Sequence, residues 1–430
     1  GSGKDDPKKT EYGAGGFSAR AAETTGSGRN AVAGRGDLID FSPRHTEMSF
    51  FPYSTWKRIM REVMANADPE MFSLGESRGD LSLRSTIAHY LHFSRGVRCT
   101  PDQVVVGAGN DYLFMLLRHI LGEGRTVAME NPTYLRAAQI FRSFGYRITF
   151  VDMDEEGMVP ASVRRSDATL AYTMPAHQFP MGSVMPVARR AALLRWAGEA
   201  GDRYIIEDDY DSEFRFRGKP IPSLQSLDGA GRVIYMGTFS KAIAPAIRVS
   251  YMILPPALLA LYRQNCHFFS STVSRIDQRI LDEFMKNGHF ERYLNKMRNI
   301  YKVRHDELIE QLGPFRDRFR IRGAGTGLHV VLEALPDASF PGIKMSGGDP
   351  VSGSDRGPGH DSCFGPGHSL VTGPGSDRGP GHDSCFGPGH SLVTGPGSDR
   401  DPGSCPGSGL GNGPGPDPFS VERELSRLAL

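Results

Sequence analysis

The chain has 430 residues, a formal net charge of +1 and 23% charged residues. Its length allows two or three packed units with a large core, and excludes a single small binding module. The near-neutral charge does not indicate a polyanionic partner, so we expect this chain itself to bind no nucleic acid. No run approaches the roughly 20 apolar residues needed to cross a bilayer, so the sequence predicts a soluble chain with no membrane partner.

Cysteine usage and the first residues bear on the compartment. Two of the five cysteines, Cys99 and Cys266, stand alone in the part expected to fold, which is typical of a reducing cytoplasm. The chain starts with Gly-, Lys- and Asp-rich sequence and no apolar run, which argues against a secretory signal. The predicted localisation is therefore cytoplasmic.

Residues 1–36 are interpreted as a disordered leader or interdomain linker.

From residue 37 to about 335, short β-rich runs alternate with helical patterns, which predicts an α/β fold around a mostly parallel sheet of seven strands. The expected strands are Val104–Val106, Thr126–Met129, Ile148–Asp152, Leu170–Thr173, Tyr204–Ile206, Val233–Met236 and Ser250–Leu254. The expected crossover helices are Asn110–Leu121 and Pro186–Ala197. Apolar residues then recur every three or four positions from Phe290, which predicts a long amphipathic helix. The run GLHVVL (Gly327–Leu332) predicts a strand of a second, smaller domain.

Residues 337–418 differ in kind, because Gly, Pro, Ser and Asp dominate them. A 22-residue segment that starts at Gly353 recurs from Gly375 and begins again at Gly397. This composition predicts disorder. Each full copy offers two histidines and a cysteine (His360, Cys363 and His368, then His382, Cys385 and His390), which makes metal binding an alternative. Three potential ligands fall short of a closed zinc site, so no metal is predicted. Residues 419–430 resume a helical pattern.

Three segments carry the candidate chemistry. In YIIEDDYDSEF (204–214), an apolar strand delivers Asp208 and Tyr210 at its carboxyl end, where open α/β sheets bind ligands. We interpret the other acids there, Glu207, Asp209 and Asp211, as solvated loop charges. In RVIYMGTFSK (232–241), the end of another strand supplies a lysine and two hydroxyls: Lys241, Thr238 and Ser240.

The third segment, VVVGAGN (104–110), joins a strand, a glycine turn and a helix start, which suits a bound phosphate. The third glycine of the dinucleotide pattern is missing. Together the segments offer an anion cradle, a carboxylate and a lysine at one sheet edge. Pyridoxal 5'-phosphate (PLP) needs these groups for its phosphate, its pyridine nitrogen and its aldehyde, and Arg248 is a candidate guanidinium for the phosphate.

Four stretches in order, ENPTYLRA, PAHQFPMG, EDDYDSEFRF and GTFSKAIAPAIRVSYMILP, resemble the aminotransferase-like domain of the MocR-type regulators, a branch of the GntR superfamily, and thus the class I and II aminotransferases. The resemblance runs from about Asp40 to about Leu332. It implies a fold-type I PLP-dependent transferase with a truncated α+β small domain. The implied division is an N-terminal segment at 37–90, a large PLP-binding domain at 91–270 and a partial small domain at 271–336.

The resemblance also implies residue roles. The catalytic residues would be Lys241 as the Schiff-base lysine, Asp208 at the pyridine nitrogen and Tyr210 at the phenolic oxygen. The phosphate would be held by Thr238, Ser240 and Arg248 and by the amides of Gly109, Asn110 and Asp111. Tyr134 would cover the pyridine face, and Arg136 would bind a substrate carboxylate.

Several positions depart from the family pattern. Phe179 replaces a cofactor-contacting asparagine, for which His177 or Gln178 could compensate, and Met181 replaces a threonine. Two further departures concern the phosphate: Leu74 replaces a tyrosine that reaches the neighbouring subunit's phosphate, and the Asp111 carboxylate would be unfavourable there unless it points away.

Two functions remain open. The first is a PLP-dependent aminotransferase that acts on an amino acid or related amine through Lys241. The alternative is the effector-sensing domain of a MocR-type regulator whose DNA-binding module is absent from this chain. A homodimer is expected in both cases, because fold-type I sites form between subunits. Because a second carboxylate-binding arginine would lie past Leu430, we expect PLP binding with slow turnover, and GLHVVL left as an exposed edge strand.

Overall fold

The computed structural model of the chain describes residues 46–218, 221–335 and 369–372. The expected leader, the tail helix and the histidines and cysteines of the repeats lie outside these ranges. The helices are α1 (Tyr53–Ala65), α2 (Leu81–Arg95), α3 (Asn110–Leu121), α4 (Leu135–Ser143), α5 (Pro160–Arg165), α6 (Val187–Gly198), α7 (Phe239–Ala242), α8 (Pro256–Asn265), α9 (Arg275–Lys286) and α10 (His289–Gln311). The strands are β1 (Val104–Gly107), β2 (Thr126–Glu130), β3 (Arg147–Val151), β4 (Met153–Asp154), β5 (Gly157–Met158), β6 (Leu170–Thr173), β7 (Tyr204–Asp209), β8 (Val233–Thr238), β9 (Ser250–Ile253), β10 (Phe319–Arg322), β11 (Val330–Ala334) and β12 (Ser369–Thr372).

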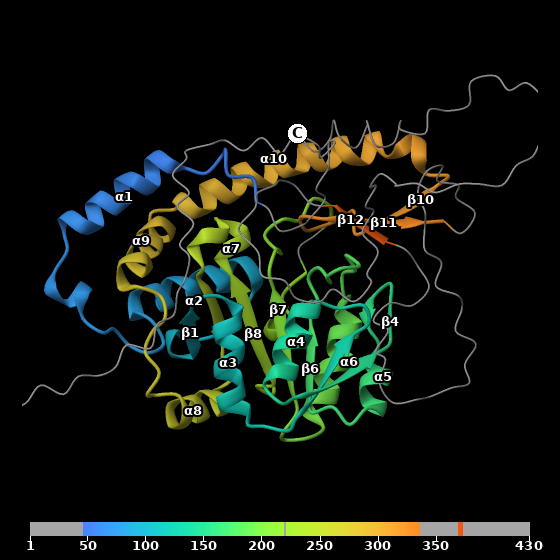
Figure 1. Ribbon diagram of the computed structural model, residues 1–430, viewed down its shortest axis with the longest axis horizontal. Coiled ribbons are helices and arrows are strands. Elements are labelled where there is room, and N and C mark those ends of the chain that lie inside the picture. Colours follow the sequence, from blue (N-terminus) through green and yellow to red (C-terminus); the bar gives the residue numbers. More distant parts are fainter. Residues whose placement is uncertain (1–45, 219–220, 336–368, 373–430) are drawn as a thin grey trace, which may run out of the picture. The chain divides into compact units, whose positions relative to one another are not determined.

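A seven-stranded sheet forms the centre of the fold, in the order β1-β9-β8-β7-β6-β2-β3 (Figure 1). Strands β3, β2, β6, β7 and β8 pair in parallel, and β9 runs antiparallel to both of its neighbours, β8 and β1. Every one of the seven expected strands is present. The α/β class and the mostly parallel sheet are therefore confirmed.

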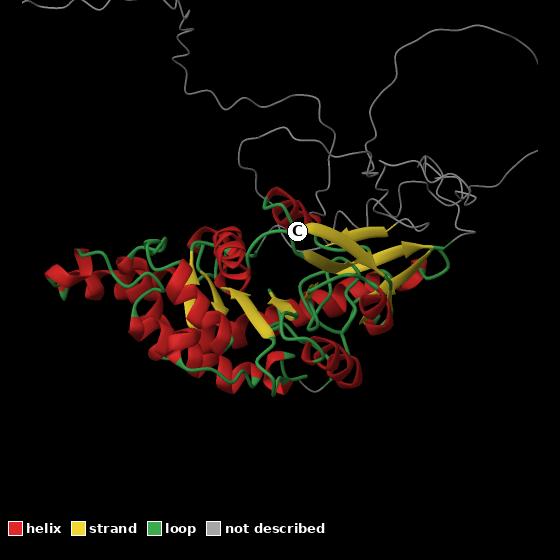
Figure 2. Ribbon diagram, turned by 90° about the horizontal axis from the view of Figure 1, so that it is seen from below, coloured by secondary structure: helices red, strands yellow, loops and turns green. Residues whose placement is uncertain are grey.

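Helices cover both faces of this sheet (Figure 2). Because side chains alternate along a strand, Val105 packs on one face, with α3, α4 and α8. Val104 and Val106 pack on the other face, with α2, α9 and α10. Helices α5 and α6 cover the rest of that second face, over β6 and β7. Burial on both sides explains why these strands read as continuous apolar runs in the sequence.

The second sheet corrects two expectations. Strand β11 has a partner on each side, because β10 and β12 both pair with it in antiparallel register. It is therefore not the exposed edge that the sequence suggested. Strand β12 lies inside the Gly- and Pro-rich stretch expected to be disordered throughout, and it is formed by the short run SLVT. Leu, Val and Thr suit a strand, and the long-range pairing with β11 outweighs the flanking composition.

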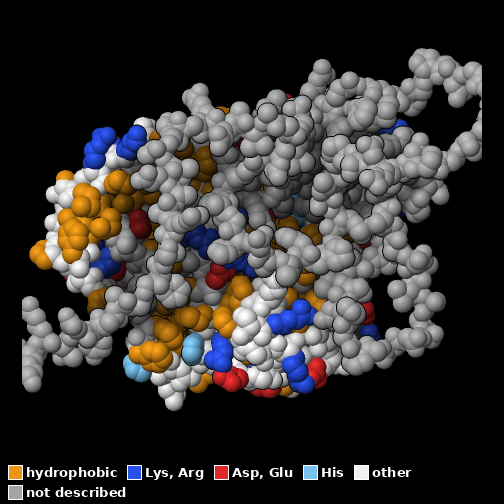
Figure 3. Space-filling model, in the orientation of Figure 1, with side chains coloured by type: hydrophobic (Ala, Val, Ile, Leu, Met, Phe, Trp, Pro, Cys, Tyr) orange, Lys and Arg blue, Asp and Glu red, His pale blue; other side chains and the backbone are white. Residues whose placement is uncertain are grey.

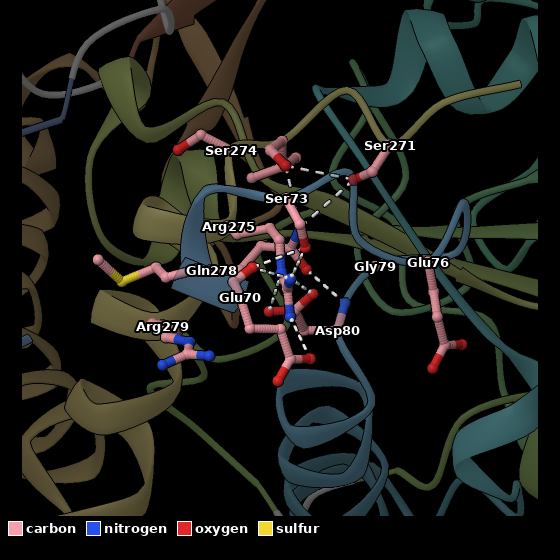
Figure 4. A network of polar contacts seen from close by, with 12 residues as sticks. Glu70, Ser73, Glu76, Gly79, Asp80, Ser271, Ser274, Arg275, Gln278 and Arg279 are labelled. Carbon is pink, nitrogen blue, oxygen red and sulfur yellow. Dashed lines mark hydrogen bonds and ion pairs between the residues drawn. The ribbon is translucent and has the colours of Figure 1, made fainter. Parts of the chain in front are cut away.

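A polar network fixes the start of α9 against the segment before α2 (Figure 4). Arg275 Nε donates to Asp80 Oδ1 at 2.9 Å, and the Asp80 amide donates to Gln278 Oε1 at 2.8 Å. Gln278 also donates to the backbone of the loop before α9. In that loop, Thr272 Oγ1 accepts the amide of Ala108 at 3.0 Å. The network thus holds the loop that supports the glycine turn after β1.

Candidate active site

The strand registers bring the candidate segments to one edge of the sheet. Ser250, the first residue of β9, lies opposite Gly107 on one side and Thr238 on the other. Its hydroxyl donates to Thr238 Oγ1 at 2.9 Å. Asp208 lies one strand further, on β7 beside β8. The glycine turn, the carboxylate and the residues before Lys241 therefore meet at this edge, as expected from the sequence.

One end of this edge has the features of a phosphate site. Gly109 precedes α3 with φ 91°, and a Cβ there would lie 2.2 Å from a guanidinium nitrogen of Arg248. Only glycine therefore lets Arg248 approach the helix start so closely. The first amides of α3 have no partner within the helix and face outward with its positive dipole end. The Ser240 hydroxyl is buried without a hydrogen-bond partner among the described residues. Amides, a hydroxyl and a guanidinium at one place fit a phosphate group.

The Asp111 side chain resolves one departure from the family pattern. Its carboxylate accepts a hydrogen bond from Arg136 Nη2 at 2.5 Å, and both side chains are exposed. The carboxylate is therefore bound to Arg136, while the Asp111 amide remains in the first turn of α3. Arg136 is also the arginine expected to bind a substrate carboxylate. To bind Arg136, a substrate carboxylate would have to displace Asp111.

Asp208 has the environment that a pyridine nitrogen requires. Its side chain is buried and accepts the Tyr172 hydroxyl at 2.6 Å, and Asn110 Nδ2 lies 3.5 Å from its other oxygen. Burial raises the pKa of Asp208 to about 6. A protonated ring nitrogen beside it would favour the ionised carboxylate. Asn110 also begins α3, so it ties this end of the site to the phosphate end.

Lys241 lies in the short helix α7, directly after β8. Thr238 caps this helix, since its Oγ1 accepts the Ser240 amide at 3.1 Å. Burial lowers the pKa of the Lys241 ammonium group, and the Asp211 carboxylate opposes that shift. A lowered pKa increases the fraction of neutral amine, which is the form that reacts with carbonyl groups.

Tyr210 belongs to a buried hydrogen-bonded chain that the sequence did not reveal. His177 Nδ1 lies 3.1 Å from the Tyr210 hydroxyl and 2.9 Å from Asp211 Oδ2. Asp211 also accepts the amide of Leu328 at 3.1 Å. Gly327 makes this packing possible, because a Cβ there would lie 1.9 Å from the His177 ring. The chain therefore fixes the tyrosine expected to contact the cofactor.

The interpretation of Glu207, Asp209 and Asp211 as solvated charges is wrong, since their exposed fractions are 0%, 6% and 1%. Strand β7 continues through Asp209 and is buried along its whole length. The two acids on it have internal partners: Glu207 accepts the amides of the segment 224–225, and Asp209 accepts Arg95 Nε at 2.8 Å.

The loop between β6 and α6 contains two of the positions that depart from the family pattern, Phe179 and Met181. Gln178 donates to the carbonyl of Pro132 and accepts the amide of Met181, each at 2.9 Å, so it fixes the loop itself. His177 is the residue of this loop that contacts Tyr210. The Phe179 ring packs edge-on against Tyr134, with centroids 5.9 Å apart. Both aromatic positions thus belong to the wall of the site.

A buried trio of possible metal ligands, His177, Asp211 and His329, lies behind Tyr210, with ligand atoms all within 4.8 Å of one another. His177 and Asp211 already bond to each other, and His329 Nε2 donates to the carbonyl of Pro180 at 3.0 Å. Burial and the neighbouring His177 lower the pKa of His329 to about 3, so this ring is neutral.

Sequence reasoning missed Tyr172, Ser250 and Thr272 as well. Tyr172 and Ser250 lie on expected strands beside Asp208 and Thr238, so strand order would have pointed to them. Thr272 lies in a loop far along the chain from the glycine turn it contacts, and no local pattern marks it.

In the described part of the chain, no helix combines the length and the apolar character needed to traverse a bilayer.

Comparisons with known proteins agree with this geometry. The profile of the family "Aminotransferase class I and II" matches residues 46–331. The HTH-type transcriptional regulator YdeL of Bacillus subtilis is 40% identical over 299 residues, covering 69% of this chain and 64% of that protein. The probable rhizopine catabolism regulatory protein MocR of Rhizobium meliloti is 35% identical over 274 residues, covering 64% and 55%. The chain thus spans between about half and two thirds of the length of these regulators.

Enzymes of the same fold are similar as well. Aromatic-amino-acid aminotransferase 1 of Thermococcus litoralis is 27% identical over 292 residues, covering 65% of this chain and 69% of that enzyme. The crystal structure of Pyrococcus horikoshii kynurenine aminotransferase has a TM-score of 0.62 at 26% identity, covering 71% of this chain and 78% of that one. The chain belongs to the class I and II aminotransferase family and has its fold-type I architecture.

Proposed function

We propose that this chain is a PLP-dependent aminotransferase domain that binds its cofactor through Lys241 and acts on an amino acid or a related amine. The observation that carries the proposal is the sheet edge where a half-buried lysine, a buried carboxylate and a group of phosphate-binding donors meet. The free Ser240 hydroxyl and the close approach of Arg248 to Gly109 fit the cofactor's phosphate. Family membership supports the same cofactor.

The bound cofactor would supply an electron sink that stabilises negative charge at the substrate Cα. In this proposal Asp208 keeps the ring nitrogen protonated and Tyr210 donates to the phenolic oxygen. The phosphate is held by Thr238, Ser240, Arg248 and the amides of Gly109, Asn110 and Asp111. Tyr134 covers the ring face, and Arg136 orients a substrate carboxylate after it releases Asp111.

Lys241 has a second task in this reaction. Once released from the cofactor, the Lys241 amine would take the proton from the substrate Cα and deliver it to the cofactor carbon C4', two bonds away. Burial favours this role, because it lowers the pKa of the ammonium group. The buried chain from Asp211 through His177 to Tyr210 keeps the phenol positioned during the transfer.

A second candidate function rests on the identity to regulators such as YdeL. In this case the same site binds PLP and an amine as an effector, and DNA is bound by a module outside this chain. Both functions are compatible with the proposed division at residues 37–90, 91–270 and 271–336, and with a cytoplasmic location.

We also propose that the chain acts as a homodimer. Large apolar side chains are exposed on α1 and the segment after it: Tyr53, Met60, Met64, Phe72 and Leu74, with Leu74 85% exposed. Figure 3 shows apolar side chains gathered at this end of the face in view. Exposed apolar patches of this kind mark protein interfaces. Light scattering of the PLP-loaded chain should give a dimer, and a strictly monomeric, fully loaded chain would contradict this.

The deciding experiment for the reaction is a single turnover with the PLP-loaded chain. A panel of amino acids and polyamines is added, the protein is quenched with acid, and pyridoxamine 5'-phosphate is quantified. An aminotransferase converts its bound PLP to this product with at least one amine, and the Lys241→Ala variant does not. Bound PLP that responds spectroscopically to an amine without forming the product would instead support the effector-sensing function.

A further inference from the structure

A second cavity, with a volume of about 250 Å³, lies apart from the residues assigned to PLP. Its walls come from α2, α6 and α10, from the segment after β7 and from the segment before β11 (Figure 1). Four arginines line it, Arg95, Arg190, Arg215 and Arg298, together with one carboxyl group, that of Glu213. Four guanidinium groups around one cavity repel one another unless negative charge balances them, so we ask which anions pair with each arginine.

Two of these arginines have structural partners. Arg95 Nε donates to Asp209 Oδ2 at 2.8 Å, and both side chains are buried. Arg190 is fully buried and donates to three backbone carbonyls, those of Pro175, Met185 and Pro222. They fix α2 and α6 to neighbouring segments, and the Asp209 carboxylate balances the charge of Arg95.

The other two arginines lack a carboxylate. Within the described ranges, neither Arg215 nor Arg298 lies within ion-pair distance of an acidic side chain. Arg298 donates to the carbonyl of Glu213 at 2.7 Å and to Asn295 Oδ1 at 2.8 Å. Arg215 Nε is buried without an acceptor in that part of the chain, and so is Arg95 Nη2, on a side chain only 9% exposed. Buried donors without acceptors are costly and rare in folded proteins.

Glu213 offsets little of this charge. Its carboxyl oxygen accepts the Tyr90 hydroxyl at 3.1 Å, and burial together with the Asp209 charge raises its pKa to about 7. It is therefore largely protonated below neutral pH. Burial and the nearby Arg95 charge also lower the pKa of Arg215.

We propose that this cavity binds a small dianion of the phosphate class, either free phosphate or the phosphate group of a small monoester. Guanidinium groups match phosphate oxygens with paired, charge-assisted hydrogen bonds, and four arginines line this cavity. The volume of about 250 Å³ admits such a group. A bound anion would link α2 and α10 to the segment that follows Tyr210 and Asp211, and the site is independent of the proposed function.

The test is calorimetric titration of the PLP-loaded full chain, freed of excess PLP, with inorganic phosphate at constant ionic strength. We expect one phosphate site whose affinity falls at least about tenfold in Arg215→Gln and in Arg298→Gln, because each removes a charged donor. Arg217→Gln is the matched control, since Arg217 is an exposed neighbour outside the cavity. Glu213→Gln removes the one lining carboxylate and should tighten binding at pH 8.

Further arms identify the source and the site. Titration with sulfate, with glycerol 3-phosphate and with malonate separates a free anion, a phosphate monoester and a dicarboxylate. Arg248→Gln should leave the phosphate affinity unchanged, since Arg248 belongs to the cofactor site. Loss of binding in Arg248→Gln with no effect of Arg215→Gln would overturn the proposal, as would absence of phosphate binding or tighter binding of malonate than of phosphate. If the Arg298→Gln variant unfolds at a lower temperature than the unmodified chain, the phosphate affinities of Arg215→Gln and Glu213→Gln test the proposal instead.

Discussion

The active-site edge and the arginine-lined cavity are both polar, but their charged side chains differ in whether they have partners of opposite charge. At the active-site edge each buried carboxylate has a partner: Asp208 has Tyr172, Asp209 has Arg95, and Asp211 has His177. In the neighbouring cavity, Arg215 and Arg298 have no carboxylate within the described residues. The carboxylates of the first region are therefore paired within the protein, and they position groups for a cofactor. The second has guanidinium groups without a carboxylate, with which the proposed anion would pair.

The largest effect is expected at Asp208, whose role in the proposal depends on its charge. Asp208→Asn keeps the shape and the Tyr172 contact but cannot hold a proton on the ring nitrogen. We expect the rate of amino-group transfer to fall on the order of 100-fold or more, in the range found when one preorganised electrostatic contact is removed. Single-turnover rates measure it, with the exposed Asp202→Asn as control. An unchanged rate would show that Asp208 is only structural.

The packing beneath Tyr210 gives the next effect. Gly327→Ala places a methyl group 1.9 Å from the His177 ring, at a residue with φ 78°. We expect a loss of about 2–4 kcal/mol in the free energy of unfolding, because overpacking and backbone strain add. Chemical denaturation measures it. Gly201→Ala is the matched control, since no atom lies within 4 Å of its added Cβ. Equal stability of the two variants would mean that His177 does not hold its place against Gly327.

The sequence predicted the sheet well because its strands are buried on both faces and are separated by glycine turns and amphipathic helices. Position at the ends of expected strands made Asp208 and Lys241 candidates, and the resemblance to a known family implied their roles. The burial of Asp209 and Asp211 could not be predicted, because their partners, Arg95 and His177, are distant in sequence. For the same reason, composition could not predict that a short run in the Gly- and Pro-rich stretch would pair with β11.

The next effect concerns Glu130, a buried carboxyl group that forms no ion pair with any residue the structure describes. It is fully buried, accepts Thr173 Oγ1 at 2.9 Å, and burial raises its pKa from 4.5 to about 7. The folded chain therefore binds an extra proton between these values, and stability falls as pH rises through this window. Glu130→Gln should remove about 1–3 kcal/mol of this loss, measured by urea unfolding at pH 5 and pH 8. An identical pH dependence in both proteins would contradict the assignment.

The smallest effect concerns the exposed pair between Asp111 and Arg136. Asp111→Asn frees the guanidinium, so a substrate carboxylate no longer has to displace an ion pair. Since exposed pairs contribute roughly 0–1 kcal/mol, we expect KM for amino acids to fall by up to about fivefold. Amines without a carboxylate should be unaffected, which provides the control. A similar change for both classes would show that Arg136 does not contact the substrate carboxylate.

Covalent attachment of PLP tests the central claim most directly. The chain is incubated with PLP, reduced with borohydride, digested and mapped by mass spectrometry. We predict one modified residue, Lys241, in the peptide that follows β8, and no stable adduct in Lys241→Ala, with Lys286→Ala as a folded control whose lysine is exposed. An adduct that persists in Lys241→Ala, or one located at another lysine in the unmodified chain, would contradict the account.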